Sequence, residues 1–171
     1  MWRYCGQERP PFAVVPLPGQ ESVWDYPRPP RVEPDAREVV IRAGALEVAR
    51  TRRALRVLET ASPPTFYVLR SDVNSALLHT AAGESTCEWK GAAGYASVVV
   101  PGTVCDRAAW FYADPLPGFE ALRDYIGFYP SPLACFVDGQ RVQPQPGRFY
   151  AGWVTPEIVG PFKGDAGSQA W

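Results

Sequence analysis

The segment TCEWKGAAGY (residues 86–95) places a thiol, an indole and an ammonium within four positions of one another, followed by glycines and a tyrosine. A lysine held between an indole and a glycine turn could neutralise an anion, or could lose its proton more readily once water is excluded. We interpret the segment as a binding loop first and a reaction centre second. The alternative is a glycine turn with a solvated lysine and a core cysteine. The candidate ligand-binding residues here are Cys87, Trp89 and Gly91, and the candidate acid–base residues are Lys90 and Tyr95.

A carboxylate shares the apolar face of a predicted strand at residues 54–59. Alternation of side chains along a strand places Leu55, Val57 and Glu59 on one face. Burying an unpaired carboxylate is costly, so such a group either pairs with a cation or has a raised pKa. Glu59 is therefore a candidate catalytic acid. The alternative is that Glu59 lies at the strand end and reaches solvent there.

Aromatic residues are dense enough to build both a core and a lined pocket. Alternation places Trp110 and Tyr112 on one face of a predicted strand, and it places Tyr67 on the face opposite Phe66. Core packing is the usual role of such residues, but clusters of Trp and Tyr also hold flat or cationic ligands. We predict Tyr67, Trp110 and Tyr112 as further ligand-binding residues.

The cysteines and the histidine do not have the spacing of a metal site. The chain has four cysteines without a C-x-x-C pair and a single histidine, His79, whereas tetrahedral zinc needs clustered thiolates and imidazoles. We therefore expect no metal, no cofactor and no disulfide framework. A nucleophile activated by histidine would depend on His79 alone, which is not favoured.

Charge and hydropathy exclude two classes of partner. The 171 residues have a net charge of −1, so the chain lacks the basic surface that binds nucleic acid. The N-terminus has charges and prolines where a signal peptide has an apolar core, and no run reaches the length of a membrane span. We expect a soluble, cytoplasmic protein with a small-molecule ligand.

The elements that must position these residues are mainly strands. Nineteen prolines and fifteen glycines separate short segments that are β-branched or aromatic. Many short antiparallel strands predict a β-sandwich or barrel that is partly open. The expected strands are 39–42, 46–50, 54–59, 65–69, 95–100, 108–112, 133–137, 140–142 and 149–154. Two short helices are expected, at 72–79 after a Ser71 cap and at 119–126.

One domain accounts for the length of the chain. We predict an extended N-terminal arm at residues 1–20, a single β-rich domain at 21–163 and a C-terminal tail at 164–171, because both ends are rich in proline, glycine and small residues.

Five ordered motifs resemble those of the bacterial family known as domain of unknown function 427, from about Glu21 to the C-terminus. The motifs are ESVWDYPRPPRVE, VARTRRALRVLETASPPTFYV, STCEWKGAAGYASV, AAWFYADP and GFYPSPLACFVDGQRVQPQPGRFYAGWVTPEIVGPFKG. The resemblance implies a β-tent fold, similar to the cereblon ligand-binding domain and to methionine sulfoxide reductases of the B class. Those relatives commonly use zinc clamps, for which this sequence lacks the cysteine pairs.

The family sometimes has a nucleotidyltransferase label. Such enzymes need clustered acidic residues for divalent metals beside a phosphate-binding glycine loop, and the sequence has no D-x-D pair. The resemblance instead implies that the end of the strand at Glu59 and Thr60, the loop 87–91 and the strands with Tyr95 and Trp110 converge at the open end of the tent.

Three classes of function follow from this reading. In the first, the protein is a binding module whose aromatic-lined site is built around Glu59, Lys90 and Tyr95. In the second, it is a metal-independent enzyme in which these groups act as acid and base on a small metabolite. In the third, it is an interaction scaffold, such as a homodimer.

Overall fold

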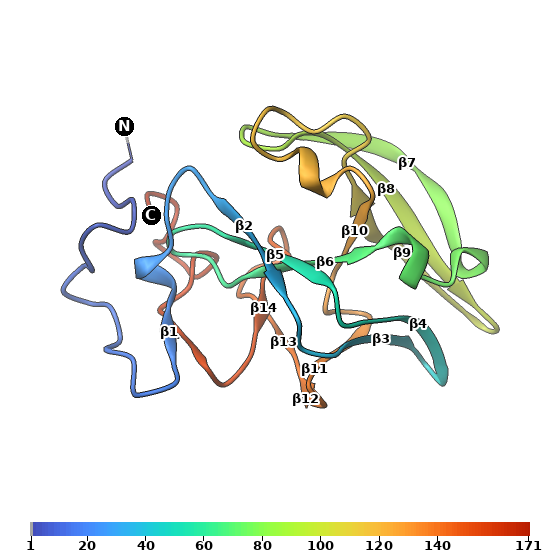
Figure 1. Cartoon of the computed structure of the whole chain (residues 1–171), viewed down its shortest axis with the longest axis horizontal. Helices are drawn as coiled ribbons and strands as arrows, with labels where there is room; N and C mark the ends of the chain where they lie inside the picture. Colours follow the sequence, from blue (N-terminus) through green and yellow to red (C-terminus); the bar gives the residue numbers. More distant parts are fainter. Residues whose placement is uncertain (1) are drawn as a thin grey trace.

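An open antiparallel sheet of seven strands is the largest element of the computed structural model, which describes residues 2–171 (Figure 1). Every neighbouring pair is antiparallel, and the strand order is linear, so β2 and β7 are free edges. The order is β2 (Arg31–Asp35), β5 (Ala54–Leu58), β6 (Thr65–Leu69), β10 (Tyr125–Phe128), β9 (Thr103–Phe111), β8 (Gly91–Val100) and β7 (Leu78–Cys87).

A second sheet has four strands and covers one face of the first. Two short strand pairs lie outside both sheets, β1 (Glu21–Ser22) with β15 (Ile158–Val159) and β13 (Gln143–Pro144) with β14 (Trp153–Val154). The four-stranded order is β12 (Gln140–Arg141), β11 (Ala134–Val137), β3 (Val39–Ala43) and β4 (Leu46–Thr51). The mainly β fold predicted from the sequence is confirmed.

The main core lies between these two sheets. Phe66 and Val68 of β6 point into it, together with Ile41 of β3 and Cys135 of β11. The Phe66 ring stacks on that of Trp153, with 4.9 Å between ring centroids. Because side chains alternate along a strand, every second residue of the inner strands points into this core. The residues between them point out of the opposite face of the sheet.

The opposite face of the seven-stranded sheet carries a second apolar cluster that is rich in aromatic rings. We call it the aromatic face. Its buried members are Val57, Tyr67, Ala93, Trp110, Tyr112, Phe119 and Leu122. Tyr67 and Phe66 lie on opposite faces, and Trp110 and Tyr112 share one face, as strand alternation predicted.

The two expected helices are three-residue 3-10 turns. In place of a helix at 72–79 the chain forms η2 (Arg70–Asp72) and η3 (Ser75–Leu77), and then begins β7. The prediction was wrong because the whole of β7 pairs with β8, which supplies backbone hydrogen bonds that local sequence does not reveal. At 119–126 only η4 (Glu120–Leu122) is helical, and the chain then enters β10.

The strand predictions need corrections at several places. The hairpin of β3 and β4 and the strands β5 and β6 are confirmed, whereas β2, β7 and β10 were missed. The strand expected at 149–154 is reduced to β14, because Phe149 is 80% exposed and lies in a loop over the aromatic face.

The two ends of the described chain lie on the same side of the molecule (Figure 1). Residues 2–20 form no strand, and their Phe12 ring stacks on that of Trp171 with 5.1 Å between centroids. Trp24 of η1 (Val23–Asp25) packs edge-on against both rings. The division into arm, domain and tail stays a prediction.

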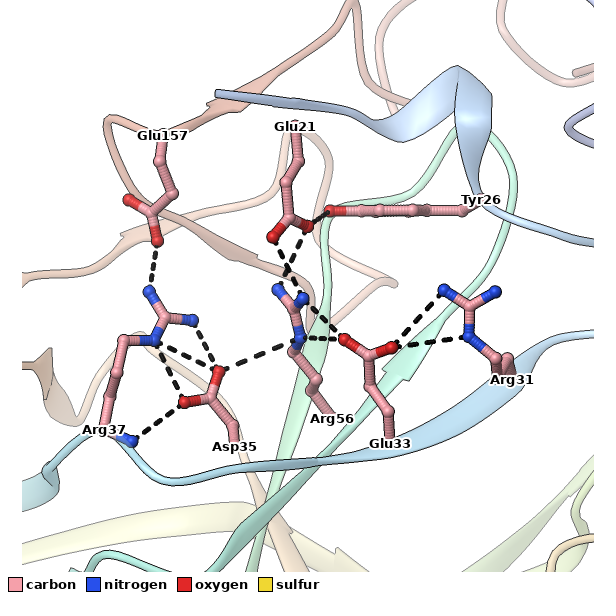
Figure 2. A network of polar contacts seen from close by, with 8 residues as sticks. All are labelled: Glu21, Tyr26, Arg31, Glu33, Asp35, Arg37, Arg56 and Glu157. Carbon is pink, nitrogen blue, oxygen red and sulfur yellow. Dashed lines mark hydrogen bonds and ion pairs between the residues drawn. The ribbon is translucent and has the colours of Figure 1, made fainter. Parts of the chain in front are cut away.

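A network of charged side chains ties the N-terminal and C-terminal segments to the large sheet (Figure 2). Arg56 of β5, whose side chain is 11% exposed, contacts the carboxylates of Glu21 at 3.0 Å, Glu33 at 2.6 Å and Asp35 at 3.8 Å. Arg37 bridges Asp35 to Glu157 just before β15. This network fixes the strands that flank the aromatic face.

Candidate functional site

A cavity of about 250 Å³ opens on the aromatic face. Its walls come from the ends of β5 and β7, from β6 and β9, and from the segments 62–65 and 145–151. Six aromatic side chains line it: Tyr67, Trp110, Tyr112, Tyr129, Phe149 and Tyr150.

Six of the nine predicted site residues line this cavity. They come from four separate parts of the chain, which the large sheet brings together. They are Glu59, Tyr67, Cys87, Lys90, Trp110 and Tyr112.

The other three predicted residues lie behind or beside the cavity wall. The Tyr95 hydroxyl forms a hydrogen bond with Ser85 Oγ at 2.7 Å, and Ser85 itself lines the cavity. Trp89 packs against the aromatic face, and within residues 2–171 its Nε1 is the one buried side-chain nitrogen or oxygen without a hydrogen-bond partner. Gly91 begins β8 with φ of +97°, which allows the tight hairpin that carries Lys90.

Glu59 reaches the cavity directly after the end of β5, on the same side as Val57. Its Oε1 lies 3.3 Å from Nε of Arg28, whose side chain is 1% exposed. Arg28 also donates a hydrogen bond to the carbonyl oxygen of Thr60 at 2.8 Å and one to that of Tyr4 at 3.3 Å. The Glu59 carboxylate is thus paired with a buried cation. This pairing is one of the two outcomes expected for a carboxylate on the apolar face of a strand. Sequence patterns gave no signal for Arg28, because its contacts come from segments far apart in the chain.

The phenols at the base of the cavity are held neutral. Trp110 Nε1 donates a hydrogen bond to the Tyr67 hydroxyl at 3.3 Å. Burial raises the pKa of Tyr67 and of Tyr112 far above the ordinary value for tyrosine. Both hydroxyls therefore keep their protons at neutral pH and can donate hydrogen bonds.

Both lysines of the chain line this one cavity. The sequence has fifteen arginines but only Lys90 and Lys163 as lysines. Lys90 Nζ lies 5.9 Å from the centre of the Tyr112 ring. Sequence reasoning missed Lys163, although the scarcity of lysine was a signal that singled it out.

The backbone of Lys163 is fixed on both sides of its side chain. Its N–H donates to the carbonyl oxygen of Ala61 at 2.7 Å, and its carbonyl oxygen accepts a hydrogen bond from Gln145 Nε2 at 2.6 Å. Its Nζ lies 5.1 Å from the Trp2 ring and 5.7 Å from the Tyr150 ring.

The pKa of Lys163 is lowered, chiefly by burial. The neighbouring Arg28 guanidinium lowers the pKa further, whereas Glu59 and Glu88 oppose the shift. Within residues 2–171 neither lysine forms a salt bridge shorter than 4.0 Å. The cavity therefore holds two lysine side chains without a salt bridge and one carboxylate that Arg28 already balances.

Residues 2–171 contain no group of three or more His, Cys, Asp or Glu side chains placed to hold a metal ion. In that part of the chain no helix has the length and apolar content to cross a membrane.

The family model described as "Domain of unknown function (DUF427)" matches residues 31–143. The chain belongs to the DUF427 family. Both large sheets of this DUF427 protein, and all nine residues predicted as its site, lie within the matched segment. Arg28 and Lys163 lie outside it. No curated protein matches this DUF427 chain.

Proposed function

We propose that this DUF427 protein binds a small organic anion with a flat apolar body in the cavity of the aromatic face. The observation that carries the proposal is the placement of both lysines in one aromatic cavity whose single carboxylate is paired with Arg28. An unpaired ammonium in a partly desolvated site favours an anionic partner.

The size of the cavity favours a molecule with one ring. Drug-sized ligands occupy pockets of roughly 300–1,000 Å³, and this cavity has about 250 Å³. Rings from β6, β9 and the loop 145–151 would contact the flat body. The neutral hydroxyls of Tyr67 and Tyr112 would donate hydrogen bonds to its polar atoms.

The other predicted residues have supporting roles in this proposal. Lys90 binds the anionic group, Glu59 with Arg28 orients a donor on the ligand, and Cys87 contacts its body. Tyr95 holds Ser85, and Trp89 and Gly91 hold the hairpin. The four free thiols support the cytoplasmic location expected from the sequence. The acid–base enzyme and the homodimer stay predictions.

A matched series of single-ring compounds tests the proposal. Benzoate, benzyl alcohol and benzylamine have similar shapes and differ in charge, so calorimetry or NMR titration with the three reports the charge preference of the cavity. We expect benzoates to bind most tightly and benzylamine least. Stronger binding of benzylamine, or equal binding of all three, would contradict an anion site.

Removal of one ammonium gives an independent test. We expect Lys90→Met to weaken benzoate binding by about tenfold or more, because a charge-assisted hydrogen bond contributes roughly 1.5–3 kcal/mol. Arg52→Met is the control, since Arg52 is an exposed cation paired with Glu38 on the β4 side of the molecule. An equal effect of both variants would show that only the overall charge matters.

A further inference from the structure

The chain uses lysine only at the cavity, and arginine for every ion pair found among residues 2–171. Arginine supplies a permanent positive charge and would serve equally well to attract an anion. Lysine differs in that it can lose a proton and act as a nucleophile. The restriction of lysine to this cavity therefore points to chemistry of a primary amine.

Of the two amines, Lys163 is the one placed to react. Its backbone is fixed by Ala61 and Gln145, and its Nζ lies among the rings of Trp2 and Tyr150. The buried guanidinium of Arg28 lies near enough to disfavour a second positive charge, and burial acts in the same direction. Both effects favour the neutral, nucleophilic form of the amine, whereas the Trp2 and Tyr150 rings favour the ammonium.

The titratable groups around Lys163 come from several elements. Glu59 lines the same cavity, and Glu88 acts on Lys163 from the turn between β7 and β8. Glu59 Oε1 lies 3.3 Å from Arg28 Nε, and its carboxylate oxygens are proton acceptors inside the cavity. Lys90 lines the same cavity and forms no ion pair among residues 2–171, so it remains available for an anionic group.

We propose that Lys163 forms a Schiff base with a small aromatic aldehyde or ketone whose anionic group is bound by Lys90. The inference rests on the proposed function, because the anion site positions the carbonyl carbon at the amine. In this proposal the cavity binds carbonyl compounds covalently through Lys163.

The reaction needs no oxidant, reductant or metal. The lone pair of neutral Lys163 Nζ attacks the carbonyl carbon, and a C–N bond forms as the C=O π bond opens to an alkoxide. Glu59 carries one proton from the nitrogen to the alkoxide oxygen, which gives a neutral carbinolamine. Glu59 then carries the second nitrogen proton to the hydroxyl, and water leaves as the C–O bond breaks and the C=N bond forms. One amine and one carbonyl thus give one imine and one water.

Reductive trapping tests the proposal on the full chain. The probe is 4-formylbenzoate with sodium cyanoborohydride, and peptide mass spectrometry locates the reduced adduct. The amines that compete with Lys163 are Lys90 and the N-terminal amine. We expect Lys163 to be labelled faster than Lys90, because burial and the Arg28 guanidinium lower the pKa of the Lys163 amine. Labelling should saturate with probe concentration.

Matched variants separate charge from nucleophilicity. Lys163→Arg keeps the positive charge but removes the primary amine, so it should lose the adduct. Lys90→Met should slow labelling by 4-formylbenzoate but leave labelling by uncharged benzaldehyde unchanged. Circular dichroism of each variant verifies folding.

The outcomes distinguish this inference from the proposed function. Binding of benzoate without preferential labelling of Lys163 overturns the Schiff-base proposal and leaves the anion site intact. Absence of benzoate binding overturns the proposed function. Equal labelling of Lys163 by benzaldehyde and by 4-formylbenzoate overturns the role given to Lys90.

Discussion

Single residues at the cavity depend on partners that lie far away in the sequence. Trp110 belongs to β9 and Tyr67 to β6, and β10 separates the two strands in the sheet. Their side chains nevertheless meet, because both point out of the aromatic face. The hydrogen bond from the Trp110 indole to the Tyr67 hydroxyl is what satisfies that buried donor.

Replacing Tyr67 by phenylalanine is expected to destabilise the protein. The variant removes the acceptor and leaves the buried Trp110 N–H unpaired, which costs about 1–3 kcal/mol. Urea denaturation measures the loss. Tyr125→Phe is the control, since no hydrogen bond of the Tyr125 hydroxyl is found among residues 2–171. Equal stability of Tyr67→Phe and the native chain would contradict the role of this bond.

At the scale of elements, two strand glycines make room for aromatic rings on neighbouring strands. Gly127 of β10 pairs with Trp110, and a Cβ atom at Gly127 would lie 2.4 Å from the indole. Gly94 of β8 pairs with Phe111, and a Cβ atom there would lie 2.7 Å from the ring. Trp110 lines the cavity of the aromatic face, whereas Phe111 does not.

The two glycines therefore give a matched pair of variants. We expect Gly127→Ala and Gly94→Ala each to cost about 1–3 kcal/mol of stability, because both overpack a closed contact. Gly127→Ala should also abolish benzoate binding by displacing Trp110, and Gly94→Ala should retain it. Urea denaturation and calorimetry on both variants check these expectations. Loss of binding in both variants would show that stability, rather than the position of Trp110, controls the site.

At the scale of the whole molecule, the network in Figure 2 connects segments from both ends of the chain to the large sheet. Arg56 is its centre and is largely buried, with three carboxylates around it. Removing the buried cation leaves the carboxylates around it without a positive partner. The free energy of unfolding therefore falls by more than it does when an exposed ion pair is removed.

We expect Arg56→Met to lower the free energy of unfolding by about 3 kcal/mol. Arg31→Met is the control: Arg31 is 56% exposed and contacts Glu33 alone, so its loss should cost less than about 1 kcal/mol. Thermal and urea denaturation compare the two. A similar loss for both variants would contradict the central place of Arg56.

Much of the fold and part of the site could be predicted from the sequence. Strand alternation placed Glu59 beside Val57, Tyr67 opposite Phe66 and Trp110 with Tyr112, because side-chain direction within one strand is a local property. The family motifs and the density of glycine and proline indicated a mainly β chain. Local patterns failed at β7 and β10, whose strands exist because neighbouring strands complete their hydrogen bonds.

The composition of the cavity was decided by tertiary structure. The sequence by itself determined that the chain has only two lysines and which face of each strand carries the aromatic rings. Only the folded chain places Lys163 beside Glu59 and Arg28, and moves Tyr95 behind Ser85. The physical reason is that these residues lie on separate strands and loops, and their distances are set by sheet order and loop path rather than by spacing along the chain.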